Sequence, residues 1–211
     1  MADRKDWVLA AALVAGMSYY ADYWLAIEGP AAVLWKGSGV ALLALWAALH
    51  ARGADGRAIA AVLGLGAAGD MLLETHGLTV GALAFLAGHV LAVRLYLRHG
   101  AGPLPLLAGN AVGIALLAAL LSGAGDGALG IAVYALGLGA MEGAAWTSRF
   151  PRRTVGLGAV LFVVSDLLIF ARQGALAESV LPGLLIWPTY FAGQALIAWG
   201  VVTTLAKGQR G

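Results

Sequence analysis

The sequence contains no cysteine among its 211 residues. Disulfides, thiolate metal sites and a cysteine nucleophile are therefore excluded. Charge is scarce as well, because charged residues make up 11% of the chain, against about 25% in an average soluble domain. The few charges stand mostly in short separators, so no stretch is long or polar enough to form a soluble domain.

Several catalytic motifs are also missing. The sequence has no HExxH or CxxC pattern, no Gly-x-Ser-x-Gly elbow and no glycine-rich phosphate loop with a lysine. Three of the four histidines lie near the ends of predicted helices, which does not favour a histidine-rich zinc site. The sequence thus indicates no metal and no cofactor.

Hydrophobic residues, by contrast, make up 61% of the chain, and the mean hydropathy is +0.86. This composition predicts an all-α polytopic membrane protein, in which the 31 glycines let helices approach closely. The first apolar stretch contains Tyr19, Tyr20 and Asp22 and has no clear cleavage site, so we interpret it as a retained helix and not a signal peptide.

A membrane-spanning helix needs roughly 20 mainly apolar residues. Eight such segments can be placed, and together they predict a single membrane domain over residues 1–211. Their approximate ranges are 7–27, 31–50, 58–75, 78–98, 104–121, 127–148, 154–172 and 181–205.

The distribution of basic residues predicts the orientation of this bundle. If the N-terminus is cytoplasmic, 11 of the 13 basic residues fall on the cytoplasmic side, as the positive-inside rule requires. They are Arg4, Lys5, Arg52, Arg57, Arg94, Arg98, Arg149, Arg152, Arg153, Lys207 and Arg210. We therefore predict an inner (plasma) membrane protein with both termini cytoplasmic. The arginines at 149, 152 and 153 are interpreted as a topology signal and not as a nucleic-acid site.

Two aspartates lie inside apolar segments, and their surroundings are similar. Gly69-Asp70-Met71-Leu72-Leu73 is followed by Phe85-Leu86-Ala87-Gly88-His89, and Ser165-Asp166-Leu167-Leu168-Ile169 is followed by Phe191-Ala192-Gly193-Gln194. Each pair occupies the third and fourth helices of a four-helix half, which suggests a parallel 4+4 internal repeat. Independent convergence of glycine-rich helices is the alternative.

The polar residues of these helices converge on one layer. At a rise of 1.5 Å per residue from the cytoplasmic end, both aspartates lie at roughly 18 Å, and the others lie at roughly 14–21 Å. The others are Lys36, His89, Tyr134 and Gln194. Only Glu142 stands apart, nearer the cytoplasmic face. Because ionisable residues at such depth usually face a cavity or a bundle interior, a shared site is favoured.

Each candidate also has a structural interpretation. Asp70 and Asp166 could cap a helix or pair with Lys36, although two carboxylates at matching depth favour a site. Lys36 could neutralise an aspartate or hold a phosphate. His89 could form a hydrogen bond across a helix contact, and Tyr134 and Tyr190 could be aromatic filling.

The chemistry available to two buried carboxyls is general acid–base catalysis, because such a pair can hold one proton at neutral pH. A substrate at this depth would be a lipid that arrives sideways through glycine-lined gaps. The sequence predicts no oxyanion hole, which favours acid-triggered cleavage of a vinyl ether over ester hydrolysis. A proton-coupled transporter of a lipid or small amphiphile is the main alternative, and a non-catalytic lipid-binding protein is the third.

Taken together, these polar residues and the motifs around them resemble the YhhN family, the bacterial relatives of animal lysoplasmalogenases. The resemblance runs from about residue 33 to 202 and rests on Lys36, Gly69-Asp70-x-Leu-Leu, Phe85-Leu-x-Gly-His89, Tyr134-Ala-Leu, Leu161-Phe162-x-x-Ser165-Asp166 and Tyr190-Phe-x-x-Gln194. It implies an eight-helix hydrolase that cleaves the vinyl ether of lysoplasmenyl-ethanolamine or lysoplasmenyl-choline. The products would be a fatty aldehyde and a glycerophospho-base. It further implies that Asp70 and Asp166 are the catalytic pair. We expect five other polar residues to bind the substrate: Lys36, His89, Tyr134, Tyr190 and Gln194.

Overall fold

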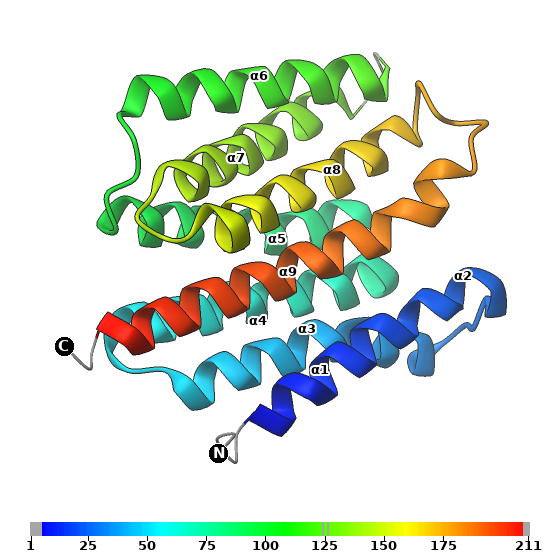
Figure 1. Ribbon diagram of the computed structural model, residues 1–211. Coiled ribbons are helices and arrows are strands. Elements are labelled where there is room, and N and C mark those ends of the chain that lie inside the picture. The colour runs from blue at the N-terminus through cyan, green and yellow to red at the C-terminus, as the bar shows by residue number, and fades with distance from the viewer. Residues whose placement is uncertain (1–5, 124, 126, 209–211) are drawn as a thin grey trace.

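The computed structural model describes residues 6–123, 125 and 127–208, and these residues form helices and connections without any strand. Figure 1 shows the helices side by side in one bundle. The elements are α1 (Asp6–Ser18), η1 (Tyr19–Ala21), α2 (Asp22–Leu25), α3 (Pro30–His50), α4 (Gly53–His76), α5 (Leu78–Arg98), α6 (Leu104–Ser122), α7 (Ala128–Thr147), η2 (Arg152–Gly156), α8 (Leu157–Ala171) and α9 (Leu181–Gly208).

The described elements form eight consecutive helical segments, because α1, η1 and α2 join into one segment and η2 leads directly into α8. Seven of these segments are long and apolar enough to cross a membrane, so the chain is a multi-pass membrane protein, as its composition predicts. The first segment is not among the seven, because η1 interrupts it and α1 has only 13 residues. The largest difference from the expected limits is at α4, which begins at Gly53 rather than near residue 58.

Glycines make the sharp reversals between helices possible. Gly77 alone separates α4 from α5, and its φ of +84° is a conformation that residues with a Cβ rarely adopt. Gly29 (φ +80°) precedes Pro30, which starts α3 at a position where a missing N–H costs nothing. These tight connections make α3, α4 and α5 consecutive antiparallel neighbours.

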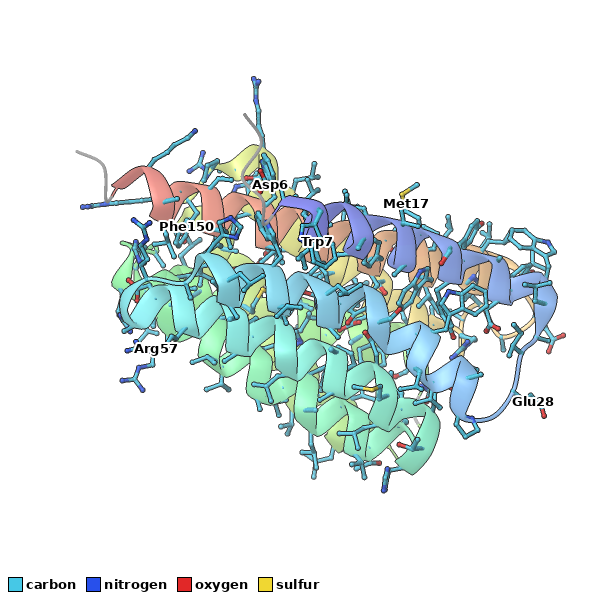
Figure 2. All side chains as sticks on the ribbon, turned by 90° about the horizontal axis from the view of Figure 1, so that it is seen from below. Asp6, Trp7, Met17, Glu28, Arg57 and Phe150 are labelled. Carbon is cyan, nitrogen blue, oxygen red and sulfur yellow. The ribbon has the colours of Figure 1, made fainter. Side chains whose placement is uncertain are left out.

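The bundle places both ends of the described chain together. In Figure 1, α1 begins and α9 ends at the same end of the bundle, whereas α2 and the α8–α9 connection lie at the other end. Figure 2 shows Arg57 near the first end and Glu28 at the second. Arg4, Lys5 and Arg210 lie outside the described residues. Which end faces the cytoplasm, and the 4+4 repeat, stay predictions.

A close helix crossing joins α8 to α9. A Cβ atom added to Gly158 would lie 2.7 Å from the carbonyl oxygen of Gly193, and the reverse distance is also 2.7 Å. Only glycine at both positions allows the two backbones to approach this closely. The crossing brings Asp166 on α8 and the polar residues of α9 into the same part of the bundle.

Candidate active site

A cavity of about 1050 Å³ lies at the end of the bundle opposite to the start of α1. Its mouth is formed by residues near helix ends and connections, among them Leu78, Gln173 and Gly183. Asp70 on α4 and Asp166 on α8 both line it and are 2% and 5% exposed. The structure thus places the two predicted carboxyls in one shared cavity.

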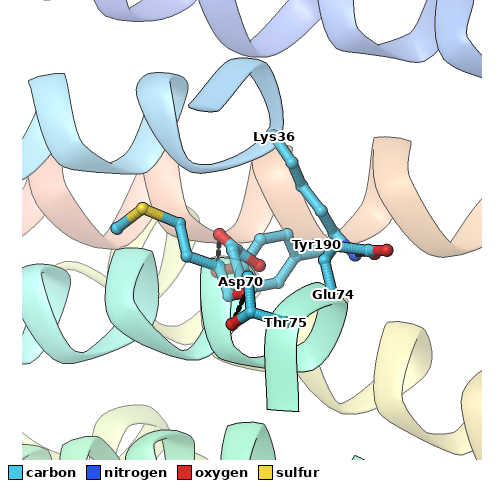
Figure 3. Close-up of polar contacts among 6 residues, drawn as sticks. Lys36, Asp70, Glu74, Thr75 and Tyr190 are labelled. Atoms are coloured by element: carbon cyan, nitrogen blue, oxygen red, sulfur yellow. Dashed lines mark hydrogen bonds and ion pairs between the residues drawn. The ribbon is translucent and has the colours of Figure 1, made fainter. Parts of the chain in front are cut away.

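Asp70 is held by a side chain from α9. The hydroxyl of Tyr190 donates a 2.8 Å hydrogen bond to Oδ2 of Asp70, and Nε2 of Gln194 donates a 3.3 Å hydrogen bond to the same hydroxyl. Figure 3 shows Tyr190 and Asp70 meeting from α9 and α4. Tyr190 and Gln194 are one helical turn apart on α9, so both face α4.

The backbone of α9 is adapted just before Tyr190. Pro188 lies inside this helix and cannot donate the hydrogen bond that its position would otherwise make. Two carbonyl groups close to Pro188 accept hydrogen bonds from side chains: Ser165 donates to the carbonyl of Ile186, and Thr189 donates to that of Leu185. These bonds satisfy polar backbone in an apolar environment. Since Ser165 directly precedes Asp166, the first bond also ties α8 to α9 beside the site.

Asp166 has a matching arrangement with different residues. The hydroxyl of Tyr134 on α7 donates a 2.6 Å hydrogen bond to Oδ2 of Asp166. Nε2 of His89 on α5 lies 3.2 Å from this hydroxyl. Since the Tyr134 proton is directed to the carboxyl, the His89 ring is the donor in that contact. Each aspartate therefore accepts a hydrogen bond from a tyrosine hydroxyl, and that hydroxyl accepts a hydrogen bond from a side-chain N–H.

His89 and Gln194 lie behind the tyrosines and do not line the large cavity. They line a separate space of about 20 Å³, which is too small for a lipid. Aromatic rings separate the two spaces: Phe162 has its ring centroid 5.1 Å from that of His89 and 5.3 Å from that of Tyr190. The arrangement makes His89 and Gln194 supports of the tyrosines and not direct contacts of a substrate in the large cavity.

Lys36 also lines the large cavity, but its partner is neither aspartate. Its Nζ lies 2.5 Å from Oε1 of Glu74, which is one turn after Asp70 on α4 (Figure 3). The ion pair of Lys36 is thus made with Glu74, and its role toward an aspartate or a phosphate stays a prediction. Sequence reasoning missed Glu74, although a spacing of four from Asp70 places both carboxylates on one helix face.

One side of the cavity reaches the apolar surface of the bundle. Leu83 on α5 and Val133 on α7 line the cavity and are 61% and 49% exposed. The two helices are in tight contact further along, where a Cβ on Gly137 would lie 2.4 Å from Leu86. Nearer the mouth, a Cβ on Gly130 would meet nothing within 4 Å. The cavity thus has an apolar lateral opening between α5 and α7.

Glu142, the acidic residue that the sequence places apart from the shared layer, also lies apart from the cavity. Glu142 on α7 accepts a 2.7 Å hydrogen bond from Asn110 on α6 and does not line the cavity. Among residues 6–123, 125 and 127–208, no group of three or more His, Asp or Glu side chains is placed to hold a metal ion.

Comparison with known protein families shows which family this chain belongs to. Residues 31–201 match the YhhN family. The chain belongs to the YhhN family. The match extends from the beginning of α3 into α9, and it contains both aspartates, both tyrosines, Lys36 and Glu74. Comparisons with curated proteins and with solved structures found no match.

Membership of the YhhN family agrees with the resemblance seen in the sequence. The matched region leaves out α1, which lines none of the cavity, and includes every side chain of the two aspartate–tyrosine pairs. The matched region therefore holds most of the cavity lining, and η1 and α2 add Tyr19, Tyr20, Asp22 and Tyr23 from outside it.

Proposed function

We propose that this YhhN protein is a lysoplasmalogenase-like hydrolase. Its substrates would be lysoplasmenyl-ethanolamine and lysoplasmenyl-choline, and its products a fatty aldehyde and a glycerophospho-base. The observation that supports this most is the pair of buried carboxyls, Asp70 and Asp166, each hydrogen-bonded by a tyrosine in one cavity with an apolar side.

The reaction needs one acid and one base. The protonated aspartate gives its proton to the vinyl carbon that is not bonded to oxygen, which leaves an oxocarbenium ion on the other carbon. The second aspartate, as carboxylate, stabilises this cation and takes a proton from water as the water adds. The hemiacetal then breaks its carbon–oxygen bond to give the aldehyde and a free glycerol hydroxyl, so that one water is consumed.

The two tyrosines fix the orientation of the aspartate carboxyls. Each phenol donates a hydrogen bond to Oδ2 of an aspartate, which leaves Oδ1 for the substrate or the water. A carboxyl on a free rotor would spend little time in the required orientation, and a fixed hydrogen bond removes that freedom. His89 and Gln194 orient the tyrosines in turn.

The proposal also includes the membrane and the orientation in which the reaction takes place. We place the protein in the inner membrane as one eight-helix domain with cytoplasmic termini, so that the cavity opens to the opposite side. The glycerol and headgroup would occupy the mouth, and the alkenyl chain would leave through the gap between α5 and α7 into the bilayer. No cofactor and no nucleic acid has a part in this scheme.

The decisive experiment is an aldehyde-release assay on a panel of lysolipids with purified protein. Asp70→Asn and Asp166→Asn should each reduce the rate by about 100-fold or more, because general acid–base catalysis contributes that much. Glu142→Gln is the matched control, since it neutralises a half-buried carboxyl outside the cavity. Full activity in the double Asn variant with a folded protein would contradict the proposal.

A proton-coupled transporter of a lipid or small amphiphile is the alternative use of the same carboxyls. It predicts substrate-dependent proton flux into proteoliposomes and no release of aldehyde. Because the two functions give different products, one preparation of protein tests both.

A further inference from the structure

The ion pair at the cavity mouth has no part in the chemistry described so far. Nζ of Lys36 on α3 and Oε1 of Glu74 on α4 are 2.5 Å apart, and both residues line the cavity. The Lys36 side chain is 16% exposed and that of Glu74 is 45% exposed. The pair therefore stands at the boundary between the open mouth and the buried carboxyls.

The Lys36–Glu74 pair lies where the headgroup of a lipid would lie if its vinyl ether were beside Asp70. Glu74 lies four residues beyond Asp70 toward the mouth, which is about 6 Å along the helix axis. In a lysoplasmalogen only the short glycerol backbone separates the vinyl ether from the phosphate. A substrate whose ether oxygen lies beside Asp70 thus brings its phosphate and the group beyond it to Lys36 and Glu74.

The charges that line the mouth are balanced. Lys36 and Arg172 are positive, and Asp22 and Glu74 are negative. Asp22 already accepts a 3.0 Å hydrogen bond from the backbone N–H of Ile27. Glu74 is the rim carboxylate that forms an ion pair with a lysine of the same cavity, so a charged ligand can replace its partner.

From this geometry, and resting on the proposed function, we propose that Glu74 is the residue that selects the headgroup. A zwitterionic headgroup separates the ion pair and replaces both partners, because its phosphate binds Lys36 and its ammonium binds Glu74. A headgroup with phosphate alone would occupy Lys36 and leave Glu74 unpaired beside a second negative charge. Breaking a partly buried pair in this way is costly, and it discriminates against the wrong ligand.

The test compares two vinyl-ether lysolipids that differ only in the headgroup, lysoplasmenyl-ethanolamine and the phosphate-only lysoplasmenic acid. Glu74→Gln should raise KM for the first and lower KM for the second, each by about tenfold, because one charged contact is lost and one repulsion is removed. The value of kcat should change little. Glu28→Gln is the control, since Glu28 is exposed and lies outside the cavity. Equal effects on both lipids would mean a structural role and would overturn the proposal.

A binding experiment separates this proposal from the hydrolase itself. Saturated 1-O-alkyl analogues of the two lipids have no vinyl bond, and their binding can be followed by the fluorescence of tryptophan, since Trp187 lines the cavity. Glu74→Gln should shift the ratio of the two dissociation constants by about 100-fold, the product of the two expected changes. This shift would support headgroup selection even in a protein that releases no aldehyde. An unchanged ratio, or no saturable binding of the ethanolamine analogue to the wild type, would overturn it, whereas aldehyde release would still support the hydrolase.

Discussion

The hydroxyl of Tyr134 donates a 2.6 Å hydrogen bond to Asp166 and lies 3.2 Å from Nε2 of His89. The contact joins three helices, α7, α8 and α5, at one oxygen atom. Tyr190 makes the same kind of connection to Asp70, with Gln194 in the place of the histidine. The two carboxyls that we propose as the catalytic pair lie on different helices and are thus oriented in the same way.

This arrangement predicts the effect of removing either hydroxyl. Tyr134→Phe and Tyr190→Phe should each lower kcat by about 10-fold or more, because a hydrogen bond to a charged group contributes about 1.5–3 kcal/mol. KM should change less, since the lost contact is to the protein and not to the substrate. Tyr96→Phe is the control, because Tyr96 is a buried tyrosine that packs on Phe150 away from the carboxyls. Steady-state kinetics of aldehyde release measures all three variants, and wild-type kcat in both site variants would contradict the prediction.

Gly66 provides a test of Gln194 that leaves Gln194 itself in place. A Cβ on Gly66 would lie 2.8 Å from Nε2 of Gln194, so that Gly66→Ala must displace the amide from Tyr190. We expect kcat to fall by about tenfold, because small displacements of positioning groups are costly to catalysis. Gly64→Ala on the same helix is the matched control, since its Cβ would meet nothing within 4 Å. Equal kcat for the two alanine variants would show that Gln194 has no positioning role.

The sequence could predict the depth of a residue but not the direction in which its side chain points. Long apolar runs and turn residues predicted the helices, and counting along them placed Asp70, Asp166 and Tyr134 in one layer. In a membrane helix, however, residues that face lipid and residues that face the core are both apolar, so hydrophobic periodicity does not indicate the buried face. For that reason depth alone allows Lys36 to neutralise an aspartate or to hold a phosphate, and it does not indicate the ion pair with Glu74.

The absence of cysteine makes the predicted orientation directly testable. Gln173 is exposed and lines the mouth of the cavity, whereas Lys207 is exposed near the end of α9 at the opposite end of the bundle. With single-cysteine variants Gln173→Cys and Lys207→Cys, a membrane-impermeant maleimide applied to intact spheroplasts should label only the first. Both should be labelled after the membrane is permeabilised. Labelling of Lys207→Cys alone in intact spheroplasts would reverse the orientation and place the mouth in the cytoplasm.

The opening between α5 and α7 predicts where a bulky residue would block the substrate. Gly130 lines the cavity at this opening, and a side chain there meets open space, so Gly130→Trp should be tolerated by the fold and fill the gap. We expect kcat/KM for long-chain lysoplasmalogens to fall by about tenfold or more, since the chain could no longer lie in a productive position. Gly113→Trp on α6 is the matched control, because Gly113 is equally open but lies outside the cavity. A short-chain substrate should be affected less by Gly130→Trp, whereas equal losses for both chain lengths would mean that the chain leaves the site by another path.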